Sequence, residues 1–226
     1  MLAHWHKYPT IQEAGRELAG AVASLLSAAV ARNGHASLAV PGGTTPSPFL
    51  AALSDKDLPW GQVTLMPTDE RFVEPHEEQS NERMILACMP AIACGLARWV
   101  SFHVEGATLG AAAIELDIRV RSLPPLDVVV LGMGADGHIA SLFPGDPFLG
   151  VSAGQHVVPT RPVGLSPRLS LSPERLVAAG RVFLLVAGEA KRNALERATG
   201  QTPLEAPVSL LLRRPEALNI YWSANG

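Results

Sequence analysis

The stretch Asp127-Val-Val-Val-Leu131, followed directly by Gly132-Met-Gly-Ala-Asp-Gly-His138, decides the fold class of this sequence. Its first half is a short, continuously apolar run rich in β-branched residues, which is typical of a strand buried on both faces of a sheet. Its second half is a glycine-rich loop that carries an aspartate and a histidine. Strands buried on both faces belong to parallel sheets that are covered by helices. The stretch therefore favours an α/β protein.

Segments of the same kinds alternate through the rest of the chain. Helical spacing of apolar residues predicts helices at 11–31, 46–53, 80–88, 109–123 and 189–198. Short apolar runs predict further strands at 37–40, 62–66, 100–104, 181–186 and 218–222. Asn33-Gly34 is expected to end the first helix, and Ser172-Pro173 to begin another. We predict a doubly wound, mostly parallel sheet with helices on both faces, forming one domain over residues 1–226.

Composition and charge exclude several classes of protein. The apolar fraction of 47% argues against a disordered chain, and 2 Cys in 226 residues argue against a disulfide scaffold. Cys88 and Cys94 are expected to be buried free thiols rather than a disulfide. The 18 Lys and Arg against 21 Asp and Glu give a net charge of −3, with no general electrostatic reason to bind nucleic acid or a membrane. No signal peptide or membrane span is recognised, so we expect a cytoplasmic protein.

Ligands of such sheets bind beyond the carboxyl ends of the strands, which directs attention to the loops that follow them. The loop after the strand at 37–40 is Pro41-Gly-Gly-Thr-Thr-Pro46. Its glycines allow close backbone approach to a ligand, its hydroxyls add donors, and the helix that follows favours an anion at its N-terminus. This pattern suits a phosphate, and it suits a tight turn with a threonine cap equally well. The candidate binding residues are Gly42, Gly43, Thr44 and Thr45.

Charged side chains follow other strands. Asp69-Glu-Arg71 follows the strand at 62–66 and offers carboxylates beside a guanidinium, for acid–base work or for binding an anion. Taken alone, a surface ion pair is the commoner explanation of such a triplet. Lys191, at the start of a helix, and Arg168 are further candidates for binding a phosphate, and Arg161 is an alternative to Arg168.

His138 is the candidate general base. It lies in the glycine-rich loop after the clearest strand, and imidazole exchanges protons readily near neutral pH. A lone histidine is usually structural, but one in such a loop is more often functional. Asp136 and Asp69 are the two candidates to orient its ring.

The four loops should open on one edge of the sheet and together form a site for a small phosphorylated substrate. They contain no cysteine nucleophile and no metal-ligand cluster. Gly132-x-Gly-x-x-Gly137 fits a dinucleotide fingerprint, but no carboxylate stands at residues 152–155, where the fingerprint requires one about 20 residues on. We therefore expect no metal and no cofactor.

With these loops assembled, the chain resembles the 6-phosphogluconolactonase family over nearly its whole length. The motifs that carry the resemblance are Leu131-Gly-Met-Gly-Ala-Asp-Gly-His-Ile-Ala-Ser-Leu-Phe-Pro-Gly145, Asp69-Glu-Arg-Phe-Val73 with Ser80-Asn81, Pro41-Gly-Gly-Thr-Thr-Pro46, Gly188-x-x-Lys191 and Arg168-Leu-Ser-Leu171. The family usually has serine where this chain has Pro41 and Thr44. Thr44 keeps the hydroxyl, whereas Pro41 has no N–H to donate.

The resemblance implies a Rossmann-like fold of the sugar-phosphate isomerase type and a hydrolase of the oxidative pentose phosphate pathway. The expected reaction opens 6-phospho-D-glucono-1,5-lactone to 6-phospho-D-gluconate, with His138 as the base and with Asp136 or Asp69 holding its ring. Arg71 is expected to face the developing oxyanion. Gly42, Gly43, Thr44, Thr45, Lys191 and Arg168 are expected to bind the phosphate. The expected partner is the small-molecule substrate alone, for a monomer or weak dimer.

Glucosamine-6-phosphate deaminases share this fold and are the main alternative. They follow the histidine closely with a glutamate, whereas here Ser141-Leu-Phe-Pro144 occupies that stretch and the next carboxylate is Asp146. A sugar-phosphate sensor without catalysis is a second alternative, against which the pair of His138 and Asp136 argues.

Overall fold

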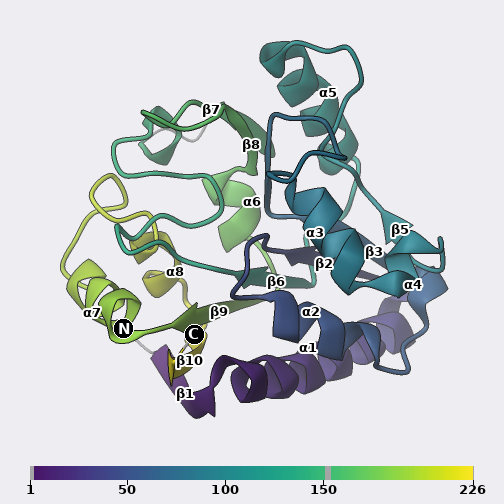
Figure 1. Ribbon diagram of the computed structural model, residues 1–226, viewed down its shortest axis with the longest axis horizontal. Helices are drawn as coiled ribbons and strands as arrows, with labels where there is room; N and C mark the ends of the chain where they lie inside the picture. Colours follow the sequence, from purple (N-terminus) through teal and green to yellow (C-terminus); the bar gives the residue numbers. More distant parts are fainter. Residues whose placement is uncertain (1–2, 151–153, 226) are drawn as a thin grey trace.

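The computed structural model describes residues 3–150 and 154–225, and its central layer is a seven-stranded sheet in the order β1-β10-β9-β6-β2-β3-β5 (Figure 1). Every neighbouring pair in this sheet runs parallel, which confirms the predicted fold class. The strands are β1 (Ala3–Thr10), β2 (Ala36–Val40), β3 (Val63–Pro67), β5 (Arg98–Trp99), β6 (Val128–Leu131), β9 (Arg181–Ala187) and β10 (Leu218–Asn225).

Helices cover both faces of the sheet, because successive residues of its buried strands point to opposite sides. Val128 and Val130 pack with the helices of one face, whereas Val129 and Leu131 pack with those of the other. The first face carries α1 (Ile11–Asn33), α2 (Ser47–Ser54), α3 (Asn81–Cys88) and α4 (Pro90–Ala93). The second carries α5 (Leu109–Arg121), α6 (Pro173–Val177), α7 (Glu189–Ala198) and α8 (Ser209–Leu212).

A small antiparallel sheet, which the sequence did not predict, lies beside the main one (Figure 1). It consists of β4 (Asp69–Arg71), β8 (Arg168–Leu171) and β7 (Val157–Thr160), in that order. Its register pairs Asp69 with Ser170 and Arg71 with Arg168. Because Leu171 N–H donates to the carbonyl of Thr68 (2.9 Å), the small sheet is joined to the chain just beyond β3. Two predicted arginines thereby become cross-strand neighbours.

Two predictions differ from the structure, and one strand was not predicted. Residues 100–104 are not a strand; the edge strand β5 is Arg98–Trp99 and makes only a short ladder with β3. The N-terminal segment is strand β1, which pairs with β10 at the opposite edge of the sheet. Cys88 and Cys94 are free, as expected, but Cys88 is only half-buried and Cys94 is exposed, because both lie on the outer helical layer and the turn after it.

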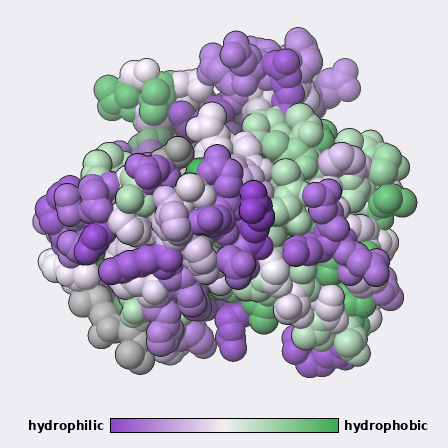
Figure 2. Space-filling view, turned by 60° about the horizontal axis from the view of Figure 1, so that its bottom comes forward, coloured by the Kyte–Doolittle hydropathy of each residue, from purple (hydrophilic) through white to green (hydrophobic). Residues whose placement is uncertain are grey.

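Helix α1 begins at the cap of Thr10, whose side chain accepts from Glu13 N–H, and ends at Gly34 in the left-handed conformation (φ 77°). By length and composition, α1 is the one helix in the described part of the chain that is long and apolar enough to cross a membrane. Its buried side chains, however, pack against the sheet and α2. Figure 2, which brings the α1 side of Figure 1 forward, shows many hydrophilic residues on that face. A helix with one face packed on a sheet and hydrophilic residues on the surface around it is typical of a folded protein core rather than of a membrane span.

Candidate active site

The loops that follow β2, β3, β6 and β9 meet at one cavity of about 290 Å3. They therefore open on the same edge of the main sheet, as predicted from the parallel strands. The candidate residues from the sequence line this cavity except Asp136, which contacts His138, and Arg161, the alternative to Arg168. The lining candidates are Gly42, Gly43, Thr44, Thr45, Asp69, Arg71, His138, Arg168 and Lys191.

The glycine-rich loop after β2 forms one wall. A Cβ on Gly42 would lie 2.0 Å from Oδ1 and 2.1 Å from Cγ of Asn81, so only glycine lets the loop lie this close to α3. Asn81 had no predicted role of its own and was named only beside Ser80 in a motif. Ser80 is the N-cap of α3, and Asn81 itself lines the cavity and donates from Nδ2 to the carbonyl of Asp69 (2.8 Å). The motif marked Asn81, but it could not show this contact, which depends on how closely Gly42 approaches α3.

Two guanidinium groups line another part of the cavity. Arg71 and Arg168 are directly paired across β4 and β8, and neither takes part in an ion pair in the described residues. Arg71 donates from Nη1 to the backbone carbonyl of Gln79. Burial lowers the pKa of Arg168, and the charge of Asp69 partly restores it. Like charges directly opposite each other on a sheet repel, so an anion between them relieves an existing strain.

The two carboxylates after β3 have separate surroundings. Asp69 is buried and accepts from the hydroxyls of Thr68 (3.0 Å) and Ser141. Glu70 turns away from the cavity to the start of α3, where it accepts from the backbone N–H groups of Asn81 (2.8 Å) and Glu82 (2.6 Å). Burial raises the pKa of Glu70, against the effect of these donors. Glu70 is thus a helix cap, and Asp69 is the carboxylate that faces the cavity.

The His138 imidazole is held by Asp136, with 2.6 Å between Nδ1 and Oδ1. The same Oδ1 accepts from the backbone N–H of His138 at 3.2 Å, which is the local geometry of an aspartate turn. The loop permits this contact because residue 134 is glycine: a Cβ there would lie 2.2 Å from Nδ1. Of the two candidates to orient the ring, Asp136 makes the contact, whereas Asp69 is bound to Ser141 and Thr68.

A carboxylate can only accept hydrogen bonds, so the contact with Asp136 places a hydrogen on Nδ1. In the neutral ring this leaves the lone pair on Nε2, and the residue lines the cavity. The arrangement suits the removal of a proton from water by Nε2, and it stabilises the imidazolium that results.

Lys191 supplies a third cation from the first turn of α7. Gly188 precedes the helix with φ 87°, and Lys191 is half-buried. Burial lowers the pKa of its ammonium group, so a bound anion would recover part of the lost hydration. With Arg71 and Arg168, the cavity holds three cations against the single carboxylate of Asp69.

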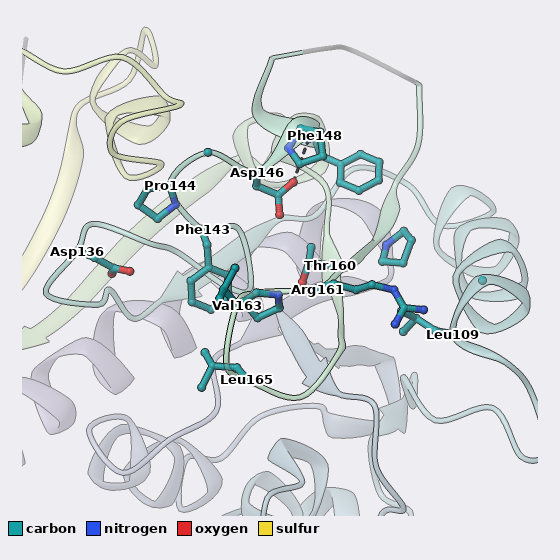
Figure 3. Close-up of a pocket in the computed structure, with 15 residues that line it drawn as sticks. Leu109, Asp136, Phe143, Pro144, Asp146, Phe148, Thr160, Arg161, Val163 and Leu165 are labelled. Atoms are coloured by element: carbon teal, nitrogen blue, oxygen red, sulfur yellow. Dashed lines mark hydrogen bonds between the residues drawn. The ribbon is translucent and has the colours of Figure 1, made fainter.

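A larger cavity of about 890 Å3 adjoins this site (Figure 3). Asp136 and Phe143 line it on the side of the histidine, and Arg161 lies across it. Arg161 and Arg168 therefore belong to different cavities, and Arg168 is the one beside His138.

A parallel α/β sheet with a cation-lined cavity and a carboxylate-held histidine at the carboxyl ends of its strands is typical of an α/β protein that binds a phosphorylated ligand. Residues 9–222 match the family described as Glucosamine-6-phosphate isomerases/6-phosphogluconolactonase. The chain belongs to this family.

Individual relatives agree with this assignment. The chain is 38% identical to a 6-phosphogluconolactonase of Rhizobium meliloti, over 99% of this chain and 100% of that one. It is 37% identical to one of Mesorhizobium japonicum, over 97% and 95% of the two chains. The crystal structure of a 6-phosphogluconolactonase from Shewanella baltica superimposes with a TM-score of 0.93 at 30% identity, covering 98% of each chain. A monomeric glucosamine-6-phosphate deaminase shares the fold at 19% identity and a TM-score of 0.80.

Proposed function

We propose that this chain is a carboxylic ester hydrolase that converts 6-phospho-D-glucono-1,5-lactone and water to 6-phospho-D-gluconate. The observation that carries the proposal is the meeting, in one cavity, of His138 held by Asp136 with the three cations Arg71, Arg168 and Lys191. The relatives named above bear the name of this activity. A base and a polyanion site are the two features that a phosphorylated lactone requires.

In the proposed reaction, Nε2 of His138 takes a proton from a water molecule while the oxygen of that water attacks the lactone carbonyl carbon. General-base assistance of this kind contributes about 10²–10⁴ in rate. Asp136 keeps the ring in the required tautomer and balances its positive charge. The bond between C1 and the ring oxygen then breaks, and the proton held on Nε2 passes to that oxygen, which leaves as the C5 hydroxyl. The lactone is already an activated acyl group, so its hydrolysis calls for no metal or cofactor.

The cations divide between the two ends of the substrate. Arg168 and Lys191, with Gly42, Gly43, Thr44 and Thr45, are proposed to hold the 6-phosphate, while Arg71 faces the oxyanion. Asp69 stands beside Arg168 and holds the small sheet to the histidine loop through Ser141. In the structure, Pro41 lines the cavity without an N–H, so the backbone donors of this loop begin at Gly42.

Deamination of glucosamine 6-phosphate is less well supported by this site. Between His138 and Asp146 no side chain carries a carboxylate, and Asp146 lines the neighbouring cavity instead. Ser141, the one hydroxyl in this stretch, is buried and bound to Asp69. The oxidative pentose phosphate pathway, the cytoplasm and a monomeric or weakly dimeric state complete the proposal.

The test is an assay that generates the lactone in situ and follows acid release, because the substrate also hydrolyses spontaneously. Purified protein should raise the rate of acid release in proportion to its concentration. A parallel reaction with glucosamine 6-phosphate should release no ammonia. Acid release equal to the uncatalysed rate at micromolar protein would refute the proposal.

A further inference from the structure

The turn that carries His138 doubles back so that residue 143 returns beside it. Ile139 and Leu142 are fully buried and form an isolated antiparallel bridge. Between them, Ala140 adopts a positive φ of 48°, a conformation that residues with a Cβ rarely adopt. Ser141 is anchored from below, where its backbone N–H donates to Ser170 Oγ at 3.2 Å. This turn presents the side chains of His138 and Phe143 next to each other.

The Phe143 ring contacts two groups of the site at once. Its centroid lies 4.5 Å from that of the His138 imidazole, with 32° between the planes. The guanidinium carbon of Arg168 lies 5.5 Å from the same centroid, within the range of a cation–π contact. Phe143 itself lines the larger cavity, behind the catalytic groups rather than among the residues that line the smaller one. It therefore reaches the substrate site only through His138 and Arg168.

We propose that Phe143 is a positioning residue that couples the general base to the anion-binding arginine. The hydrogen bond between Nδ1 and Asp136 fixes one edge of the imidazole but does not prevent the ring from rotating out of its plane. Phe143 packs against the face of the imidazole and restricts this rotation. Its other contact holds Arg168, whose charge is repelled by Arg71 across the small sheet. The expected effect of Phe143 on kcat and KM rests on the proposed function.

The kinetic test compares three variants in the lactone assay. Phe143→Leu keeps an apolar side chain but loses the flat ring, and should lower kcat and raise KM, each by about two- to tenfold. Phe143→Tyr keeps the ring and should restore both constants to within about twofold. Phe148→Leu is the matched control, since Phe148 lines the same larger cavity (Figure 3) and makes no stacking contact with His138 or cation–π contact with Arg168 in the described part of the chain, and its constants should match those of the wild type.

A double-mutant cycle separates coupling from general damage. If Phe143 acts on binding through Arg168, Phe143→Leu should raise KM in the wild type but not in an Arg168→Met background. Equal increases in both backgrounds would contradict the proposed coupling.

The last measurement does not depend on the reaction. In the NMR spectrum of the substrate-free protein, the ring C–H resonances of His138 should move downfield in Phe143→Leu, because the ring current is lost, and should stay in place in Phe148→Leu. Unmoved His138 resonances, or unchanged kcat and KM in an active enzyme, would overturn the positioning role. A wild type without lactonase activity, but with the expected shift, would instead refute the proposed function.

Discussion

Substitution of Gly134 by alanine tests how closely the histidine loop is built around its catalytic pair. The added Cβ would lie 2.2 Å from Nδ1 and 2.3 Å from Cε1 of His138, and 2.5 Å from Oδ1 of Asp136. Ordinary contact begins at about 3.4 Å, so the imidazole must retreat by about 1 Å. The φ of residue 134 is not positive, so alanine does not meet the penalty of the left-handed conformation.

A displacement of about 1 Å of a reacting group costs about 10²-fold in rate. We therefore expect Gly134→Ala to lower kcat about 100-fold, equivalent to about 2.7 kcal/mol of transition-state stabilisation. The phosphate-binding cations are untouched, so KM should change little. The assay is steady-state lactone hydrolysis, with thermal melting as the check of folding.

The matched control is Ala135→Ser, which adds one atom to the neighbouring, exposed residue of the same turn and should keep the wild-type kcat. A Gly134→Ala variant that folds and retains kcat within threefold of the wild type would refute the claim that His138 must occupy its present position.

Three further outcomes are expected. Asp136→Asn should lower kcat about ten- to 100-fold with KM nearly unchanged, because an amide no longer enforces the Nδ1–H tautomer; an unaffected kcat would show that the 2.6 Å contact is incidental to catalysis. Lys191→Met should raise KM about tenfold or more without lowering the melting temperature at pH 7. Burial lowers the pKa of Lys191, so its charge opposes folding at neutral pH. This cost fades as the pH rises through the folded-state pKa, and any stability that the variant gains should therefore shrink in alkali. A gain in stability that grew with pH would contradict this reasoning. Glu70→Gln should cost about 1–3 kcal/mol, or roughly 2–12 °C in melting temperature, because an NH2 group replaces one of the two oxygens that accept from buried donors at the start of α3, whereas the exposed Glu78→Gln should melt like the wild type.

The main sheet was predictable because its inner strands are continuously apolar and bounded by turn residues. Strands β2, β3, β6 and β9 are predicted within one or two residues of their observed bounds. The edges were not predictable in this way. Strand β1 alternates exposed and half-buried residues and includes Pro9, and residues 100–104 bury Phe102 without joining a ladder. Strand β4 is the charged tripeptide at 69–71, which becomes a strand only through its distant partner β8.

The sequence predicted which residues form the site better than it predicted the contacts between them. Loops after parallel strands must share an edge, so the sequence was sufficient to bring together the glycine-rich loop, Arg71, His138 and Lys191. It left open whether Asp136 or Asp69 holds the imidazole. The spacing Asp-Gly-His favours a local aspartate turn, a signal that was present in the sequence. The position of Asn81 in the cavity lining and the contact of the Phe143 ring with His138 depend on packing, which no local sequence pattern specifies.

The measurement that bears most directly on the central claim is kcat for His138→Ala in the lactone assay, beside the wild type and at saturating substrate. If the imidazole takes the proton from the attacking water, kcat should fall by about 10²–10⁴ while KM stays within a few-fold. A folded His138→Ala protein that hydrolyses the lactone at nearly the wild-type kcat would show that the base lies elsewhere.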